Sequence, residues 1–198
     1  MNRWLSAAIA AALLVGAWFV ARGTPDGEER LSDPFPVAAT VGTPAEGRNL
    51  GVTVHSLTLA DRVTTGGWFA EGTWLVVDLD AWAVRTESPA ALTDVWIEVG
   101  EVTYTASERP GFYDHDASLR RAGLFLAGAR TGTVAFELPA TITEERGILH
   151  LAMSDGTADS VIDLPVDFGA LAYEAEIELP SLAWADPADG AGAAPLLA

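Results

Sequence analysis

The sequence predicts an all-β protein, built as a sandwich of two antiparallel sheets with about seven to nine strands and preceded by one N-terminal transmembrane or signal helix. From residue 37 onward, apolar and polar residues alternate with a period of two, and helical spacing of apolar residues is hard to find. Turn residues interrupt this alternation about every 8 to 14 residues. Because an alternating strand buries only one face, a second sheet must cover it.

The composition indicates one folded domain with a strongly acidic surface. The 198 residues are 49% hydrophobic, include 7 Trp and contain no Cys. The lack of Cys excludes disulfides, zinc–thiolate sites, thiol catalysis and lipid attachment at an N-terminal Cys. The formal net charge is −17 and all 11 basic residues are Arg. A surface this negative repels phosphate backbones, so nucleic-acid binding is excluded as well.

Residues 1–23 are expected to form a membrane anchor or signal segment. Residues 4–21 are 18 uncharged residues, a length between the core of a signal peptide and the roughly 17 to 25 residues of a membrane-spanning helix. Trp4 and Trp18 are typical of membrane-interface positions and favour a retained anchor. We therefore expect a single-pass cell-membrane protein, in contact with lipid, whose domain lies on the extracytoplasmic side. A secreted protein is the alternative.

The next segments set the expected domain boundaries. Residues 24–36 are rich in Pro, Gly and charge and predict a polar spacer. The β-sandwich domain is expected over residues 37–180. Residues 181–198, rich in Gly, Ala, Pro and Asp, predict a disordered tail.

The first strand signal of the domain contains a change of face. Val52 and Val54 share one face, whereas Leu57 and Leu59 share the other. The alternation therefore slips near His55, which predicts a β-bulge or a strand that crosses between sheets.

The strongest strand signal is the run GTWLVVDLDAWAV at residues 72–84. One face of this strand is wholly apolar, which is typical of a central strand. The other face is expected to point outward and carries Trp74, Asp78, Asp80 and Trp82. Further strands are predicted at residues 95–99, 102–104, 128–139, 149–153, 162–166 and 173–179. The last of these reads YEAEIEL and alternates without exception.

Taken in order, these segments resemble a known family. An export segment, a polar spacer, the strand NLGVTVHSLTL, the strand GTWLVVDLDAWAV and the later run LFLAGARTGTVAFELP are similar to the telokin-like, immunoglobulin-related domains of secreted and lipid-anchored Gram-positive proteins (domain of unknown function 4352). The similarity covers about residues 47–166, with residues 74–84 and 128–139 in the places of the two main motifs. Arg85 replaces the family's usual Asn, and the lipobox Cys is missing.

The resemblance implies an immunoglobulin-like antiparallel β-sandwich that serves in binding or as an accessory of the cell envelope. It carries no catalytic residues over to this chain, and fold similarity alone does not assign a function. Without a lipobox Cys, the helix would be the anchor.

The polar clusters give only weak signals for chemistry. The histidines of the chain are His55, His115 and His150. Their spacing does not suit a metal pair on one element. The Asp-His-Asp run at residues 114–116 is the densest ligand-like cluster, but it lacks the spacing of an EF-hand loop. Asp78 and Asp80 share a strand face about 7 Å apart, a common arrangement without catalytic meaning by itself. We therefore predict no catalytic residue, no cofactor and no metal.

Two loops carry aromatic residues that could contact a partner. Trp68 and Phe69 follow Gly66-Gly67 in TTGGWFAEGTW, and Phe112 and Tyr113 stand in SERPGFYDHDASLRR. The alternative is that these aromatics fold back onto the core, with the nearby Arg residues neutralising the acids. Large aromatics at a loop tip are typical of protein-contact sites.

These observations predict a non-enzymatic, membrane-anchored extracytoplasmic β-sandwich that binds or assists another envelope or membrane protein. The alternative is a secreted or anchored protein that binds a small ligand or cation with its acidic surface. In the C-terminal third, no Arg follows Arg146 while many Asp and Glu do. This pattern is typical of a solvated, solubilising face, and a site for a basic partner or divalent cations is the second interpretation.

Overall fold

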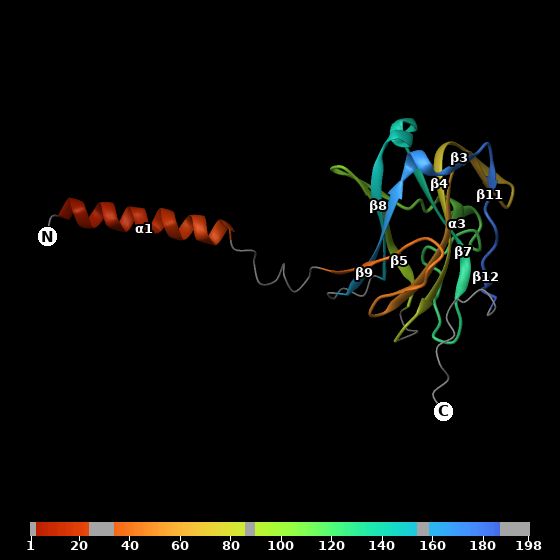
Figure 1. The fold of residues 1–198 in the computed structure, drawn as a ribbon, viewed down its shortest axis with the longest axis horizontal. Helices are drawn as coiled ribbons and strands as arrows, with labels where there is room; N and C mark the ends of the chain where they lie inside the picture. The colour runs from red at the N-terminus through yellow and green to blue at the C-terminus, as the bar shows by residue number, and fades with distance from the viewer. Residues whose placement is uncertain (1–2, 24–33, 86–89, 154–158, 187–198) are drawn as a thin grey trace, which may run out of the picture. The chain divides into compact units, whose positions relative to one another are not determined.

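The computed structural model describes residues 3–23, 34–85, 90–153 and 159–186 (Figure 1). The chain divides into two units, Met1–Asp33 and Pro34–Ala198. The first unit holds α1, Arg3–Gly23, in which Trp18 is half exposed and lies 4.6 Å from the Arg22 guanidinium. The Trp4 side chain and residues 24–33 lie outside the described residues. Within the described part of the chain, no helix is long and apolar enough to cross a membrane.

The second unit is a β-sandwich of two sheets. The five-stranded sheet has the order β1-β9-β8-β5-β6. Its strands are β1 (Phe35–Ala38), β9 (Ser160–Asp167), β8 (Arg146–Met153), β5 (Leu92–Val99) and β6 (Val102–Thr105).

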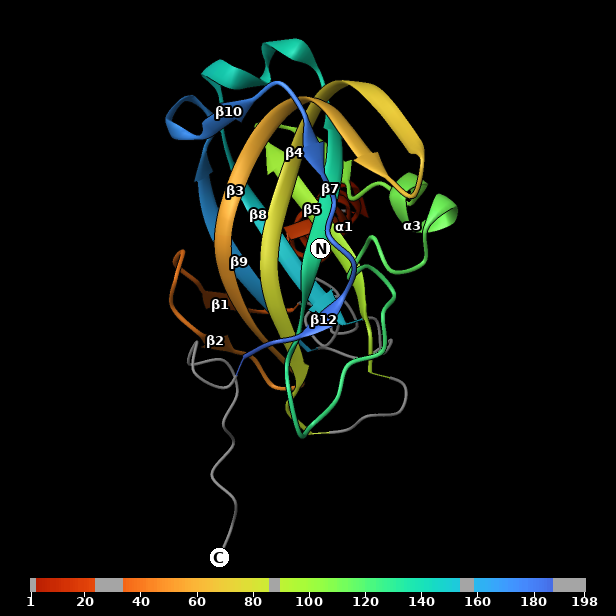
Figure 2. The ribbon, with the colours of Figure 1, turned by 90° about the vertical axis from the view of Figure 1, so that its right-hand side faces the viewer.

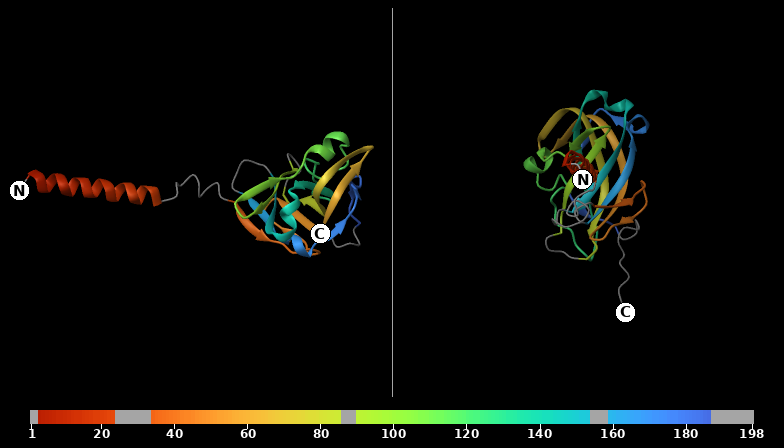
Figure 3. Two further views of the ribbon diagram at one scale, coloured as in Figure 1. Left: turned by 90° about the horizontal axis from the view of Figure 1, so that it is seen from above. Right: turned by 90° about the vertical axis from the view of Figure 1, so that its left-hand side faces the viewer.

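The seven-stranded sheet has the order β10-β3-β4-β7-β12, and two further short strands, β2 and β11, pair with β3. Its strands are β10 (Ala172–Glu174), β3 (Leu50–Thr65), β4 (Trp68–Ala83), β7 (Arg130–Leu138), β12 (Ala183–Trp184), β2 (Ala45–Glu46) and β11 (Ile177–Glu178). The short helices are α3 (Arg109–Tyr113), η1 (Ala140–Glu144) and η2 (Phe168–Ala170). Figure 3 shows the two sheets from two further directions.

The core lies between the two sheets and is built from their alternating inward residues. The seven-stranded sheet contributes Leu75, Val77 and Leu79, and the five-stranded sheet contributes Ile97 and Leu151, all of them fully buried. The predicted β-sandwich and the predicted apolar face of residues 72–84 are confirmed, because β4 lies between β3 and β7 with this face in the core.

Two details of the predicted sheets are wrong. The sandwich is not purely antiparallel, because β1 pairs with β9, and β10 and β11 pair with β3, in parallel. These strands come from the two ends of the unit and return along an existing edge instead of forming hairpins. The described residues form eight strands of four or more residues and four shorter ones, so the predicted seven to nine covers the longer strands alone.

β3 and β4 form one long hairpin, although TTGGWFAEGTW was predicted to be a loop. Thr65 pairs with Trp68, and the turn between them consists of Gly66 and Gly67, both with positive φ (53° and 83°). Two successive residues with positive φ are typical of the tight turn that matches strand twist. The predicted bulge at His55 is confirmed, since the pairing register shifts between Val54 and Ser56.

The outer face of the seven-stranded sheet is covered, which corrects the prediction that residues 74–82 expose one side. Trp74, Asp80 and Trp82 are buried on that face. Residues 172–186, here called the C-terminal strap, run along β3 as β10 and β11 and then cross to β7 as β12 (Figure 2). The strap also hydrogen bonds to the loop that precedes β7, because Leu182 N donates to Asp116 O at 2.7 Å.

The strap also changes the predicted boundaries and the predicted last strand. Residues 173–179 form two short strands whose Tyr173 side chain is exposed, so the perfect alternation does not mark a half-buried strand. β12 lies inside the predicted tail, and β1 begins at Phe35, inside the predicted spacer. Residues 187–198 of the predicted tail lie outside the described residues.

Candidate functional site

A well-formed cavity lies against the loop that joins β6 to β7. It has a volume of about 670 Å³, within the usual range for ligand pockets. The side chains that give it its chemistry are Glu108, Arg109, Phe112, Tyr113, Arg120 and Arg121. We call residues 107–122 the cavity loop.

Backbone hydrogen bonds fix the cavity loop at both ends. At its start, Ser107 N donates to Ala135 O at 2.7 Å, so the chain leaves the five-stranded sheet and immediately joins the other. At its end, Leu119 N donates to Thr133 O and Arg121 N donates to Leu92 O, both at 2.8 Å. The cavity therefore stands on strands of both sheets, which hold its side chains in place.

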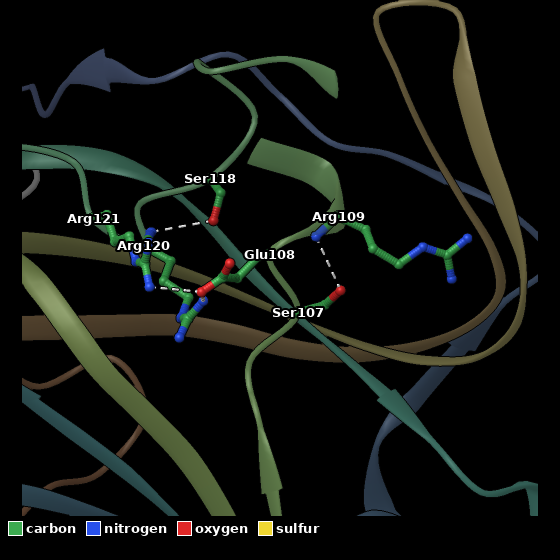
Figure 4. A network of polar contacts seen from close by, with 6 residues as sticks. All are labelled: Ser107, Glu108, Arg109, Ser118, Arg120 and Arg121. Carbon is green, nitrogen blue, oxygen red and sulfur yellow. Dashed lines mark hydrogen bonds and ion pairs between the residues drawn. The ribbon is translucent and has the colours of Figure 1, made fainter. Parts of the chain in front are cut away.

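One end of the cavity is a cluster of charges (Figure 4). Arg120 Nη1 and Arg121 Nη2 both contact Glu108 Oε1, at 2.5 Å and 2.8 Å. Hydrogen bonding from Arg120, together with the positive charges of Arg120 and Arg121, lowers the pKa of Glu108 below 4.5. Glu108 is thus an ionised carboxylate at neutral pH. Its contacts show that the two guanidinium groups together can bind a carboxylate.

Arg121 adopts a backbone conformation that is unfavourable for its residue type. Its φ of 66° makes it the one residue other than Gly with positive φ in the described part of the chain. A side chain costs free energy in this left-handed region, so such residues are uncommon and cluster at functional sites. The conformation directs an Arg side chain that is 66% exposed beside the cavity.

The other end of the cavity is aromatic. Trp68 of β4 stacks on Tyr113 of α3 with ring centroids 5.0 Å apart and planes at 13°, and Phe112 meets Tyr113 edge to face. Arg109 points away from the other two arginines in Figure 4. Its guanidinium lies 5.3 Å from the Trp68 ring centroid and 3.0 Å from Glu137 Oε2.

The structure brings three of the four predicted contact aromatics together. Trp68, Phe112 and Tyr113 meet where the β3–β4 hairpin approaches α3, and the Thr65 hydroxyl donates to Asp114 Oδ2 at 3.0 Å to join the two loops. Phe69 is exposed elsewhere on the hairpin, under the Arg62 guanidinium at 4.0 Å. Phe112 is 77% exposed and Tyr113 is half exposed, so these two side chains do not fold back onto the core as the alternative required.

The histidines and the Asp-His-Asp run do not form a shared site. His150 stacks on Trp96 and hydrogen bonds to Asp163 Oδ1 at 2.8 Å, in the other sheet. Asp114 is used structurally, because its Oδ1 accepts a hydrogen bond from Asp116 N at 3.1 Å. Among the described residues no group of three or more His, Asp or Glu side chains could hold a metal ion.

Asp78 and Asp80 form a covered acidic pair with His55. Asp80 is 1% exposed, and its Oδ2 lies 3.0 Å from His55 Nε2. Burial raises the pKa of Asp78 above 3.8, with His55 opposing the shift and Asp80 adding to it. His55 closes over Asp80, so the pair differs from the outward, accessible carboxylates expected of a glycosidase.

The charged end of the cavity was missed as a site by sequence reasoning. Arg120 and Arg121 were expected only to neutralise the nearby acids, and Glu108 was not singled out. In the structure both arginines pair with Glu108 and not with the acids of residues 114–116. A signal was available, because two adjacent Arg residues in so acidic a chain are unusual. Nothing in the sequence indicates the positive φ of Arg121.

Comparison with known proteins adds little to this description. No family model matches the chain, and no curated protein matches it either. Among solved structures it is similar to an uncharacterized β-sandwich protein from Clostridium difficile 630, with 10% sequence identity and a TM-score of 0.42, over 67% of this chain and 95% of that chain.

Proposed function

We propose that this chain is a non-enzymatic extracytoplasmic binding module that engages another envelope or membrane protein through the aromatic end of its cavity. The proposal includes anchoring at the cell membrane by the N-terminal segment. The observation that carries it is the meeting of Trp68, from the β3–β4 hairpin, with the exposed Phe112 and Tyr113 of α3. Rigid, exposed aromatics of this kind dominate the energetics of protein interfaces.

The location of the aromatics supports protein contact. Phe112 is 77% exposed, and no core packing requires so large an apolar side chain there. Tyr113 is held by its stack on Trp68, so little side-chain entropy is lost when a partner binds. The Arg109 guanidinium beside Trp68 adds a residue type that is enriched at interfaces.

The absence of a reaction is part of the proposal. The strand carboxylates Asp78 and Asp80 lie beneath His55 and the covered outer face, where a substrate would have no access to Asp80. The proposal also keeps the telokin-like relationship. It is supported by the pairing of residues 74–81 in β4 with residues 130–137 in β7, since these segments carry the two family-like motifs.

Site-specific photo-crosslinking tests the proposal. The full chain, with a photoreactive phenylalanine analogue at position 112, is expressed in its own host, irradiated and purified from gently solubilised membranes. One specific protein is expected to crosslink at position 112, because the aromatic end forms the interface. The matched control places the same analogue at Phe35, which is 64% exposed on β1, away from the cavity loop.

Two results would contradict the proposal. Identical crosslinked products at positions 112 and 35 would indicate non-specific proximity, and no product at 112 would indicate that no partner binds there. Mass spectrometry of the intact chain tests the anchor separately. A retained N-terminus agrees with anchoring, whereas a mature chain that starts near Thr24 would replace it with secretion.

The cavity volume also favours a second candidate, binding of a small ligand. About 670 Å³ is enough for a small molecule. A ligand that binds the native state raises its apparent stability. A thermal-shift screen of ions and metabolites on the full chain distinguishes this candidate, because a protein interface predicts no shift with small molecules alone.

A further inference from the structure

The cavity carries a charge opposite to that of the molecule as a whole. Among the described residues that line it, three are Arg and one is Glu, in a chain of formal net charge −17. Glu137, outside the lining, pairs with Arg109, which leaves Arg120 and Arg121 to share Glu108. One carboxylate therefore stands between two guanidinium groups, and positive charge remains at this end of the cavity.

The two arginines retain capacity for another hydrogen-bond acceptor. The Arg120 side chain is only 11% exposed, and its buried Nε has no hydrogen-bond partner in the described part of the chain. An unpaired donor in a desolvated position is costly and favours an acceptor. Arg121 is more exposed and contacts Glu108 through Nη2. Glu108 is 58% exposed, so it can turn aside when another carboxylate enters.

We propose that Arg120 and Arg121 bind an Asp or Glu side chain of the partner, next to an apolar partner side chain that packs on Phe112 and Tyr113. This inference rests on the proposed function, because it specifies the chemistry of the segment that occupies the same cavity. The occupant is an acidic–apolar peptide segment of a protein. Charge complementarity carries the choice, since a guanidinium pair that already holds Glu108 has the geometry for a carboxylate.

The overall charge favours a short segment over an extended polyanion. A phospholipid surface or a nucleic acid would bring many negative charges against a chain of net charge −17, and this repulsion is not confined to the cavity. A single carboxylate enters locally, between the guanidinium groups, where the short-range attraction prevails over the screened repulsion of distant charges. An apolar neighbour is needed because the adjoining wall consists of Phe112 and Tyr113.

The test uses a pair of labelled, capped peptides, Gly-Phe-Glu-Gly and Gly-Phe-Gln-Gly, and the purified full chain in mild detergent. Fluorescence polarisation is expected to show binding of the Glu peptide at least about tenfold tighter than that of the Gln peptide, because only the former is charged. Arg121→Gly should remove this preference. Its matched control is Arg146→Gln, which removes the same charge at an exposed pair with Asp167 on β8 and β9.

Thermal unfolding of Arg121→Gly separates a lost site from a lost fold. This variant is expected to be at least as stable as Arg121→Ala, since Gly tolerates the positive φ. Equal affinity for both peptides, an unchanged preference in Arg121→Gly, or no binding of either peptide at millimolar concentration would overturn the inference. The proposed function fails separately, by the crosslinking result at position 112, so a crosslinked partner together with equal peptide affinities would retain the function and reject the carboxylate.

Discussion

At the scale of single residues, the cavity loop combines favourable contacts with local strain. Arg121 stands at φ 66°, whereas the other positive φ values in the described residues belong to Gly. A left-handed conformation costs roughly 1–2 kcal/mol for a residue with a Cβ. Natural selection retains such strain where the side chain has a use, and the use inferred here is the recognition of a carboxylate.

Comparing Arg121→Gly with Arg121→Ala isolates this strain, because both variants lose the same charge and the same contact with Glu108. The Gly variant is expected to be more stable by about 1 kcal/mol, since only Ala still pays for a Cβ at positive φ. Urea denaturation followed by Trp fluorescence measures the difference. Equal stabilities would show that the backbone relaxes at no cost.

Asp78→Asn is expected to stabilise the protein at neutral pH. Burial raises the pKa of Asp78 above its ordinary 3.8, so the native state binds this proton more tightly than the unfolded state. Below pH 3.8, Asp78 is protonated in both states, and the wild type does not bear the cost of burying its charge. As the pH rises through the folded-state pKa, Asp78 ionises in the native state and the protein loses stability. Asn carries no charge and escapes this loss.

The stability difference between Asp78→Asn and wild type should accordingly be largest near neutral pH and shrink as the pH approaches about 4. Urea titrations at several pH values measure it. Glu71→Gln removes the same unit of charge at an exposed position of β4 and serves as the control. A difference that grows as the pH falls would contradict the assigned direction of the pKa shift.

At the scale of elements, the C-terminal strap is the least expected part of the fold. It covers the outer face of the seven-stranded sheet, where Leu179 packs in a second apolar cluster with Trp74 and Val76. The same segment hydrogen bonds to the cavity loop through Leu182 N and Asp116 O. The strap thus belongs to the cooperative fold and helps to hold the cavity loop in place.

Leu179→Ala tests the contribution of the strap. Leu179 is 3% exposed, so its truncation is expected to cost about 2–4 kcal/mol of unfolding free energy. Ile148→Ala, at a position that is 41% exposed on β8, should cost less than about 1 kcal/mol. Chemical denaturation of both variants gives the comparison. A similar small cost for the two would mean that the strap packs only loosely.

The sequence predicted the strands that have a clear local pattern of apolar and polar residues. It did not predict which other segments pack against those strands. The period-two pattern identified β4 and its core face, and the slip near His55 identified the bulge, because both depend on local order alone. The alternation at residues 173–179 wrongly predicted one half-buried strand. Alternation shows that one face of a strand could be buried, but it does not show that another part of the molecule packs against that face. Likewise, Trp74 and Asp80 could not be recognised as covered before the strap was placed.

The candidate site followed the same rule. Trp68, Phe112 and Tyr113 were identified because exposed aromatics next to Gly, Pro and charge stand out in a sequence. Their mutual stacking depends on the approach of the β3–β4 hairpin to α3, a long-range contact without a sequence signal. The cluster of Glu108, Arg120 and Arg121 depends on a turn of the backbone that the residue types oppose.

At the scale of the whole molecule, charge repulsion is the dominant electrostatic feature. With a net charge of −17, the folded state brings like charges together, and this repulsion destabilises it. Added salt screens the interaction over a Debye length that falls to about 10 Å at 0.1 M.

The melting temperature is therefore expected to rise as NaCl increases from low concentration to about 0.1 M, by roughly 2–4 °C for each kcal/mol of repulsion removed. Differential scanning calorimetry measures this shift. Most of the rise should be complete near 0.1 M. A melting temperature that is flat below this concentration and climbs only in concentrated salt would indicate strengthened apolar burial instead.

The pairing of the first strand with one of the last strands has a consequence for the time course of folding. β1 pairs with β9, and Arg48 N donates to Ser160 Oγ across 112 residues of sequence. Closing so large a loop carries an entropic cost that is recovered only when the late strands have formed. We expect folding in milliseconds to seconds, with no stable partial sandwich in chains that end before β9. A growing chain would therefore stay unfolded until nearly all of the domain has been synthesised, a delay that the proposed extracytoplasmic location would require of a chain exported before it folds.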